Sequence, residues 1–141
     1  MKKIIIMIGL ILIMAGCSKG GNFTTEIGKK VLDNELEGME EIASSTLTDA
    51  YNLELNDMQE YLFKQNTAGD FYAIIKTENP TEVKKQMNNY FERVKDFNSS
   101  YSPERLEILN ERLEKQLDQY LIYIVASNAD EIYEKILDEI D

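Results

Sequence analysis

Histidine is absent from the chain, and Cys17 is the only cysteine among its 141 residues. Without histidine, neither a Ser-His-Asp nor a Cys-His nucleophile can be assembled, and the commonest zinc ligand is missing. A lone cysteine cannot build a disulfide framework. The sequence also has no Ser-x-x-Lys pair and no glycine-rich phosphate loop. We therefore expect a protein that is not an enzyme, with no catalytic residues, no metal ligands and no cofactor.

Carboxylates are the one catalytic residue type that is abundant, with 26 Asp and Glu. Two of them could hydrolyse a glycosidic bond, but no pair stands out among so many. Asn52, Glu54, Asn56 and Asp57 place four oxygen-bearing side chains in one expected turn and are a candidate for calcium. They lack the order of an EF-hand loop and the glycine at its bend, so a plain turn is the preferred interpretation.

Basic residues are scarce, at 15 against 26 acidic ones, which gives a net charge of −11. Nucleic-acid binding needs Lys and Arg to neutralise phosphates, so this balance excludes nucleic acid as a partner. Anionic lipid headgroups are repelled for the same reason. The folded part of the chain is therefore expected to stand away from a bilayer surface, unless divalent cations bridge the two.

Residues 4–14 form an uncharged run behind two lysines, and this run is shorter than the roughly 20 residues of a membrane-spanning helix. It leads into Met14-Ala15-Gly16-Cys17, the small-residue pattern of a bacterial lipoprotein signal. We expect residues 1–16 to be a signal peptide that is cut before Cys17, and the Cys17 thiol to carry a diacylglycerol. The alternatives are a plain secretory signal with a chance cysteine and a cytosolic protein with an apolar end.

Lipidation of Cys17 predicts a protein anchored at the outer face of the cytoplasmic membrane of a bacterium. Each buried acyl methylene contributes about 0.8 kcal/mol, and two chains give stable anchoring. Residues 17–25 form the lipidated cysteine and a glycine-containing, flexible tether. Residues 26–141 have the length of a single domain with its own core. Loss of the two leader lysines changes the net charge from −11 to −13.

Hydrophobic spacing predicts a helix over residues 27–42, although Gly38 weakens it, and a polar turn over 52–57. Residues 58–65 and 71–77 are rich in aromatic and β-branched side chains, and the short segment between them contains a glycine. This arrangement predicts an antiparallel hairpin. The second strand is apolar on both faces, which is typical of the centre of a sheet.

Asn79-Pro80-Thr81-Glu82 has a capping residue, a proline at the first helical position and the glutamate of a capping box. The apolar stripe from Val83 to Phe97 predicts that this helix packs on the sheet. Ser102-Pro103 begins another helix, and residues 120–125 read as a strand.

The end of the chain offers two readings. Residues 112–117 fit either a continuation of the helix that begins at Ser102 or a strand paired with 120–125, and periodicity leaves both open. Asn128 and Glu131 form a second cap of the Asn-x-x-Glu kind and begin a last helix.

The Tyr51-Asn52-Leu53 turn, the Phe71–Lys76 strand, Val83, Tyr101 and the run from Tyr120 to Asp130 resemble a group of uncharacterised bacterial lipoproteins. These proteins come mostly from low-GC Gram-positive species, and their shared region is named only as a domain of unknown function. The resemblance covers roughly residues 26–140. Such proteins tend to have a glycine where this chain has Asp118-Gln119.

The resemblance implies a hairpin, a helix, a second hairpin and a last helix, which favours the strand at residues 112–117. With the first helix this gives an α+β fold, an N-terminal helix followed by ββαββα. The expected sheet is antiparallel and four-stranded, with helices packed on it. The resemblance assigns no functional residues.

Two functions from different classes remain. The preferred interpretation is a non-enzymatic module that binds a protein or a cell-envelope component through an exposed sheet face or edge. It is based on the missing catalytic residues and on Tyr61, Tyr72 and Tyr123, which could leave aromatic surface exposed, although burial of all three is the simpler outcome. The alternative is a carboxylate-dependent hydrolase that acts on a cell-wall glycan.

Overall fold

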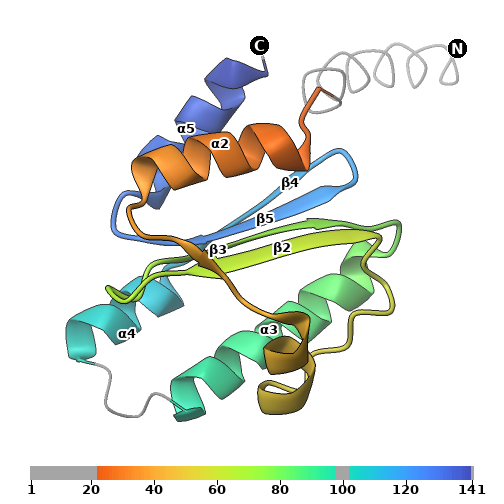
Figure 1. The fold of residues 1–141 in the computed structure, drawn as a ribbon, viewed down its shortest axis with the longest axis vertical. Coiled ribbons are helices and arrows are strands. Elements are labelled where there is room, and N and C mark those ends of the chain that lie inside the picture. The colour runs from red at the N-terminus through yellow and green to blue at the C-terminus, as the bar shows by residue number, and fades with distance from the viewer. Residues whose placement is uncertain (1–21, 98–101, 141) are drawn as a thin grey trace, which may run out of the picture.

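The computed structural model describes residues 22–97 and 102–140. Cys17, the expected signal peptide and most of the tether lie outside these ranges. The described residues form one antiparallel sheet in the order β1-β2-β3-β5-β4, with helices on both faces (Figure 1). The strands are β1 (Glu40–Glu41), β2 (Glu60–Gln65), β3 (Phe71–Lys76), β4 (Leu113–Leu117) and β5 (Tyr120–Val125). The helices are α2 (Thr25–Glu35), α3 (Pro80–Phe97), α4 (Pro103–Asn110) and α5 (Ala129–Glu139), and Thr46–Ala50 forms a π-helical turn.

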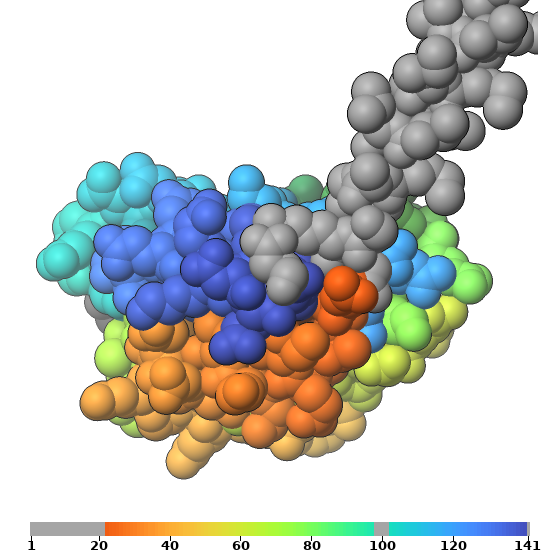
Figure 2. Space-filling view, turned by 90° about the horizontal axis from the view of Figure 1, so that it is seen from above, coloured from red at the N-terminus to blue at the C-terminus, as the bar shows by residue number. Residues whose placement is uncertain are grey.

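The two faces of the sheet carry separate hydrophobic cores, because successive side chains of a strand point to opposite faces. Helices α2 and α5 lie side by side on one face (Figure 2), where Leu32 and Ile136 pack with Ile74 of β3. Helices α3 and α4 lie on the other face, where Phe91 and Leu109 join Phe71. Both faces of the sheet are therefore covered by helices.

The predicted first hairpin is confirmed. Strands β2 and β3 pair in antiparallel register from Glu60↔Lys76 to Gln65↔Phe71. Strand β3 also pairs with β5 along its whole length, and its first five residues are buried. Strand β3 therefore lies in the centre of the sheet, as its two apolar faces predicted.

The expected four-stranded sheet is wrong by one strand, because β1 adds a fifth at the edge of β2. Glu40 and Glu41 pair with Gln65 and Lys64, and both glutamates are exposed. A two-residue strand without a buried side chain has no hydrophobic pattern, so the sequence did not reveal it. The helix expected over residues 27–42 ends at Glu35, before Gly38 takes a positive φ of 69°.

Residues 113–117 are strand rather than helix, as the family resemblance favoured. Helix α4 ends at Asn110, and β4 then pairs with β5 from Leu113↔Ile124 to Leu117↔Tyr120. The tight turn between these strands places Asp118 at a φ of 53°, in the left-handed region. Aspartate is one of the few residues other than glycine that tolerate this conformation, so the turn forms without the glycine of similar proteins.

The candidate calcium turn is held by the protein's own contacts. Asn52 has a positive φ of 53°, and the N–H of buried Leu53 donates to the carbonyl of Leu47 at 2.9 Å. The Glu54 carboxylate accepts a hydrogen bond from Gln86. Across residues 22–97 and 102–140, no three His, Cys, Asp or Glu side chains gather in a way that could hold a metal ion. Within the same ranges, no helix has both the length and the apolar character needed to cross a bilayer.

Candidate functional site

A pocket of about 620 Å³ lies where the β2–β3 loop meets α3 and α4, and we call it the hairpin pocket. Its size falls within the range of small-molecule sites. The β2–β3 loop supplies Asn66, Thr67, Gly69 and Asp70, and Glu40 lies on the same rim. Helix α4 contributes Arg105, at a point 35 positions from Asp70 in the chain.

The floor of the hairpin pocket is aromatic. Phe71 of β3 lies 5.6 Å from the Phe91 ring and 5.7 Å from the Tyr90 ring, measured between ring centroids. Tyr90 and Phe91 of α3 lie 5.4 Å apart, and Tyr51 packs on Tyr90 at 5.0 Å. Edge-to-face and tilted pairs of this kind are favourable beyond the area that they bury. Phe71, Tyr90 and Phe91 are buried in the core and shape the pocket from behind, whereas Tyr51 is partly exposed.

The β2–β3 loop is fixed by its own side chains. The backbone N–H of Asp70 donates to Asn66 Oδ1 at 2.9 Å. Asn66 Nδ2 donates to Asp70 Oδ2 at 3.1 Å and to the Glu37 carbonyl at 2.9 Å. Gly69 has a φ of 92°, a conformation that side-chain-bearing residues rarely adopt. These contacts set the position of the Asp70 carboxylate at the rim.

Arg105 crosses from α4 to this loop. Its Nη2 lies 3.7 Å from Asp70 Oδ1, and 27 % of its side chain is exposed. A Cβ built on Gly69 would lie 2.4 Å from the same Nη2, so glycine at this position makes room for the guanidinium. Arg105 donates no side-chain hydrogen bond to any residue that the structure describes. Its ion pair is also longer than the roughly 2.7–2.9 Å of a charge-assisted hydrogen bond.

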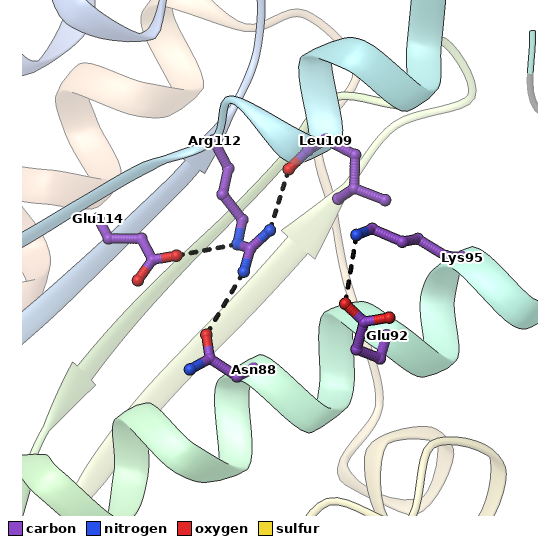
Figure 3. Close-up of polar contacts among 6 residues, drawn as sticks. All are labelled: Asn88, Glu92, Lys95, Leu109, Arg112 and Glu114. Atoms are coloured by element: carbon purple, nitrogen blue, oxygen red, sulfur yellow. Dashed lines mark hydrogen bonds and ion pairs between the residues drawn. The ribbon is translucent and has the colours of Figure 1, made fainter. Parts of the chain in front are cut away.

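A second arginine, Arg112, links residues of α3, α4 and β4 (Figure 3). Its Nη1 donates to the Leu109 carbonyl at 3.2 Å, and its Nη2 donates to Asn88 Oδ1 at 3.4 Å. Its Nε lies 3.0 Å from Glu114 Oε2, an ion pair in which Nε lacks hydrogen-bond geometry. The guanidinium carbon lies 4.2 Å from the centroid of the Phe91 ring. Arg112 thereby joins α3, α4 and β4 behind the pocket.

A polar cluster on the opposite face fastens α2 to the sheet. Asp33 accepts hydrogen bonds from the Tyr72 hydroxyl and from Lys64 Nζ, each at 2.8 Å, and Lys29 lies 3.3 Å away. Burial alone would raise the pKa of Asp33, but the hydrogen bonds from Lys64, Tyr72 and Lys29 outweigh it and hold the pKa below its usual 3.8. Burial and the Asp33 carboxylate raise the pKa of Tyr72.

This cluster therefore has the properties of a structural link. A tyrosine whose pKa is raised stays protonated at neutral pH, so Tyr72 acts as a hydrogen-bond donor rather than a base. Tyr123 is also buried, and burial with the nearby Glu114 carboxylate raises its pKa. Of the three tyrosines considered from the sequence, only Tyr61 reaches the surface, with 38 % of its area exposed.

A family model named "Domain of unknown function (DUF4358)" matches residues 32–126. The chain belongs to the DUF4358 family. The resemblance to proteins that share a domain of unknown function is thus confirmed. The DUF4358 region runs from the end of α2 to the residue after β5, and it contains every residue that lines the hairpin pocket. No curated protein and no solved structure matches the chain.

Cys17, the one site residue predicted from the sequence, lies outside both the described residues and the DUF4358 match, so its lipidation stays a prediction. The pocket residues were not found from the sequence. The segment Asn66–Asp70 was recognised as a hairpin loop, but nothing local connects it with Arg105 or with the α3 stripe. The only local signal was the positive charge of Arg105, one turn after the Ser102-Pro103 cap. This charge does not indicate a pocket until the fold brings the β2–β3 loop next to it.

Proposed function

We propose that this DUF4358 protein is a lipoprotein held by Cys17 at the outer face of the cytoplasmic membrane. In this proposal it is a non-enzymatic module that binds a protein or a cell-envelope component in the hairpin pocket. The observation that carries the proposal is the pocket itself, a hollow of about 620 Å³ with a charged and amide-bearing rim over buried aromatic rings. Placed polar groups of this kind fix the orientation of a ligand in a binding site.

The position of the pocket on the sheet supports this proposal. The described chain begins beside Tyr120, at the start of β5, where Phe23 packs on the Tyr120 ring at 5.0 Å. The pocket lies at the other end of β5, where it is lined by Val125. The two ends of this strand are about 17 Å apart at roughly 3.3 Å per residue. Figure 1 shows the start of α2 and the β2–β3 loop at opposite ends of the sheet. A tether to Cys17 therefore leaves the pocket directed away from the anchor.

The alternative function, a glycan hydrolase, gains no support from the site. Such an enzyme uses one carboxylic acid that stays protonated and a second carboxylate across the scissile bond. In the hairpin pocket Asp70 is already engaged by Arg105 and Asn66, and the other lining carboxylate is Glu40. We therefore keep binding as the proposed function.

Site-specific photo-crosslinking in the producing cells tests the proposal. A photoreactive amino acid replaces Thr67, an exposed residue on the pocket rim, in the full chain. The matched control replaces Glu134, an exposed residue of α5 on the opposite face of the sheet. The expected result is a discrete, membrane-associated adduct from Thr67 that is missing from Glu134. The same adducts from both positions, or none from either, would contradict pocket binding.

A further inference from the structure

The two edges of the sheet are protected to different degrees. Strand β1 is only two residues long and carries two exposed glutamates, and a short, charged edge of this kind discourages the addition of another strand. Strand β4 is five residues long, and no strand that the structure describes lies on its outer side. The side chains of residues 114–116 are exposed. Strand β4 is therefore the longer and more open edge.

The outer side of β4 presents backbone groups that the sheet does not use. The Thr77 N–H donates to the Gln119 carbonyl at 2.9 Å, so the odd-numbered residues of β5 bond to β3 and the even-numbered ones bond to β4. Residues 113, 115 and 117 of β4 lie opposite those even-numbered residues. The N–H and C=O groups of Glu114 and Gln116 therefore point away from the sheet and are available to an added strand.

Positive charges flank this edge on both faces of the sheet. Lys115 lies on the face of α5, where its Nζ is 5.6 Å from the centroid of a tyrosine ring of that helix. Lys84 of α3 lies on the other face, and its Nζ donates to Gln116 Oε1 at 3.2 Å. Neither lysine has an ion pair with a carboxylate that the structure describes, whereas Glu114 is paired with Arg112 at 3.0 Å. The charge that is left without a partner at β4 is therefore positive.

A second copy of the chain does not fit this edge. If β4 paired antiparallel with itself over all five residues, Leu113 would lie opposite Leu117 and each Lys115 would lie opposite the other. Like charges directly opposite each other destabilise a strand pair. An acidic strand meets the reverse situation. A carboxylate opposite Lys115 and another opposite Gln116, close to Lys84, place an opposite charge beside each lysine.

We propose that β4 binds an extended acidic segment of a partner protein, which adds to the five-stranded sheet as a further antiparallel strand. Main-chain hydrogen bonds to Glu114 and Gln116 hold the segment, and its carboxylates pair with Lys115 and Lys84. In this mode of recognition the backbone supplies affinity and the side chains supply specificity. No residue of β4 lines the hairpin pocket, so this surface is separate from the proposed function and does not depend on it.

NMR titration of the full chain in detergent micelles tests the added strand. The probe is the blocked pentapeptide Val-Glu-Glu-Thr-Val, whose second and third residues lie opposite Gln116 and Lys115. We expect it to shift the backbone amide signals of Glu114 and Gln116. Unshifted signals would overturn the proposal.

Two N-methylated forms of the same peptide are the matched controls. Methylation of the second residue removes the N–H that donates to the Gln116 carbonyl, so we expect at least tenfold weaker binding. The N–H of the third residue points away from β4, so its methylation should change the affinity by less than about twofold. Equal affinity of the two methylated peptides would contradict strand addition.

Lys115→Glu tests the charge pairing. We expect this variant to bind Val-Glu-Glu-Thr-Val at least tenfold more weakly, and to bind Val-Glu-Lys-Thr-Val more tightly than the unmodified protein does. Lys30→Glu, at an exposed position of α2, is the control and should leave both affinities unchanged. Circular dichroism checks that each variant is folded. Unchanged peptide affinities in folded Lys115→Glu would refute the pairing.

The same spectra test the competing occupant, a second copy of the chain. Glu114 and Gln116 signals that shift with protein concentration in the absence of peptide would assign the edge to a dimer and overturn the proposal. The two proposals also fail separately. If the peptide binds β4 while the Thr67 crosslink fails, only the function of the hairpin pocket is wrong, and the converse result removes only the strand addition.

Discussion

Single residues decide the shape of the hairpin pocket. Gly69 gives the loop a backbone conformation that suits glycine and leaves space for Arg105, and Arg112 holds α3 and α4 against β4 from behind. Each of these roles depends on one side chain or on the lack of one. Each can therefore be tested with a single substitution.

Gly69→Ala tests the contact between the loop and Arg105. Gly38→Ala is the control, since Gly38 also has a positive φ, 69° against 92°, but has nothing within 4 Å of an added Cβ. We expect Gly38→Ala to show the backbone strain alone, about 1–2 kcal/mol in the free energy of unfolding. Gly69→Ala should show about the same loss in urea denaturation, because the added methyl group displaces only the flexible end of the Arg105 side chain. It should also shift the Arg105 side-chain NMR signals, which Gly38→Ala leaves in place. Unshifted Arg105 signals in Gly69→Ala would contradict the contact.

Arg112→Met tests the clamp behind the pocket. The methionine keeps an apolar stem but leaves the Leu109 carbonyl and Asn88 without their donor. We expect the free energy of unfolding to fall by about 1–3 kcal/mol. Arg93→Met, at an exposed position of α3, should change it by less than about 0.5 kcal/mol. Similar denaturation midpoints for the two variants would show that the clamp contributes nothing.

The individual residues that form the pocket could not be predicted from the sequence. Arg105 and Asp70 are 35 positions apart, and each reads on its own as an ordinary surface charge. The aromatic residues of the floor were recognised, but as core residues on a helix stripe and a strand. Their second role, as the floor of a pocket, depends on the gap between the loop and α4, which no local pattern encodes.

At the scale of elements, α2 depends on a polar link. The Asp33 carboxylate, held by Lys64 and Tyr72, connects this helix to β2 and β3. Lys64 is buried, so loss of the carboxylate leaves a buried positive charge without its partner.

Asp33→Asn should therefore destabilise the protein in a pH-dependent way. The folded-state pKa of Asp33 is lowered, so its stabilisation is fully present above the unfolded pKa, near 4, and is lost as the pH falls through the lower folded-state value. We expect a clear stability difference from the unmodified protein at pH 7 that shrinks below about pH 4. Asp49→Asn, in the exposed π-helical turn, is the control and should show little difference at any pH. A difference for Asp33→Asn that stays constant with pH would contradict the link.

The sequence predicted the elements that carry a hydrophobic pattern. The first hairpin, α3 and α5 were recognised from periodicity and capping, and β5 from its apolar run. Strand β1 was missed because its two glutamates are exposed and its pairing with β2 is a tertiary effect. The local sequence of residues 113–117 fits two structures equally well, because its leucines have helical spacing and its residues also alternate as in a strand. The family resemblance favoured the strand, which the pairing with buried β5 and the turn at Asp118 establish.

At the scale of the whole molecule, the start of the described chain and the hairpin pocket lie at opposite ends of the sheet. In the proposed lipoprotein, the net charge is −13 after loss of the leader, which would keep the domain away from anionic headgroups. The proposed tether would then hold the domain near the membrane with its pocket facing the surroundings.

Lipidation of Cys17 is the whole-molecule prediction on which this placement depends. Mass spectrometry of the native N-terminus should find a diacylglycerol-modified Cys17 as the first residue. Cys17→Ala should lose its anchor and leave the membrane fraction, whereas Ser18→Ala should remain there. An unmodified Cys17 thiol, or a Cys17→Ala protein that is still held in the membrane, would remove the anchor from the account.

The most direct test of the central claim, that the hairpin pocket is where this protein binds its partner, is hydrogen–deuterium exchange of the full chain with and without the crosslinked partner. We predict slower exchange on binding in residues 65–71 and 103–110, with little change in α2 and α5. Protection confined to α2 and α5 or to the β4 edge, with the pocket segments unchanged, would contradict the claim.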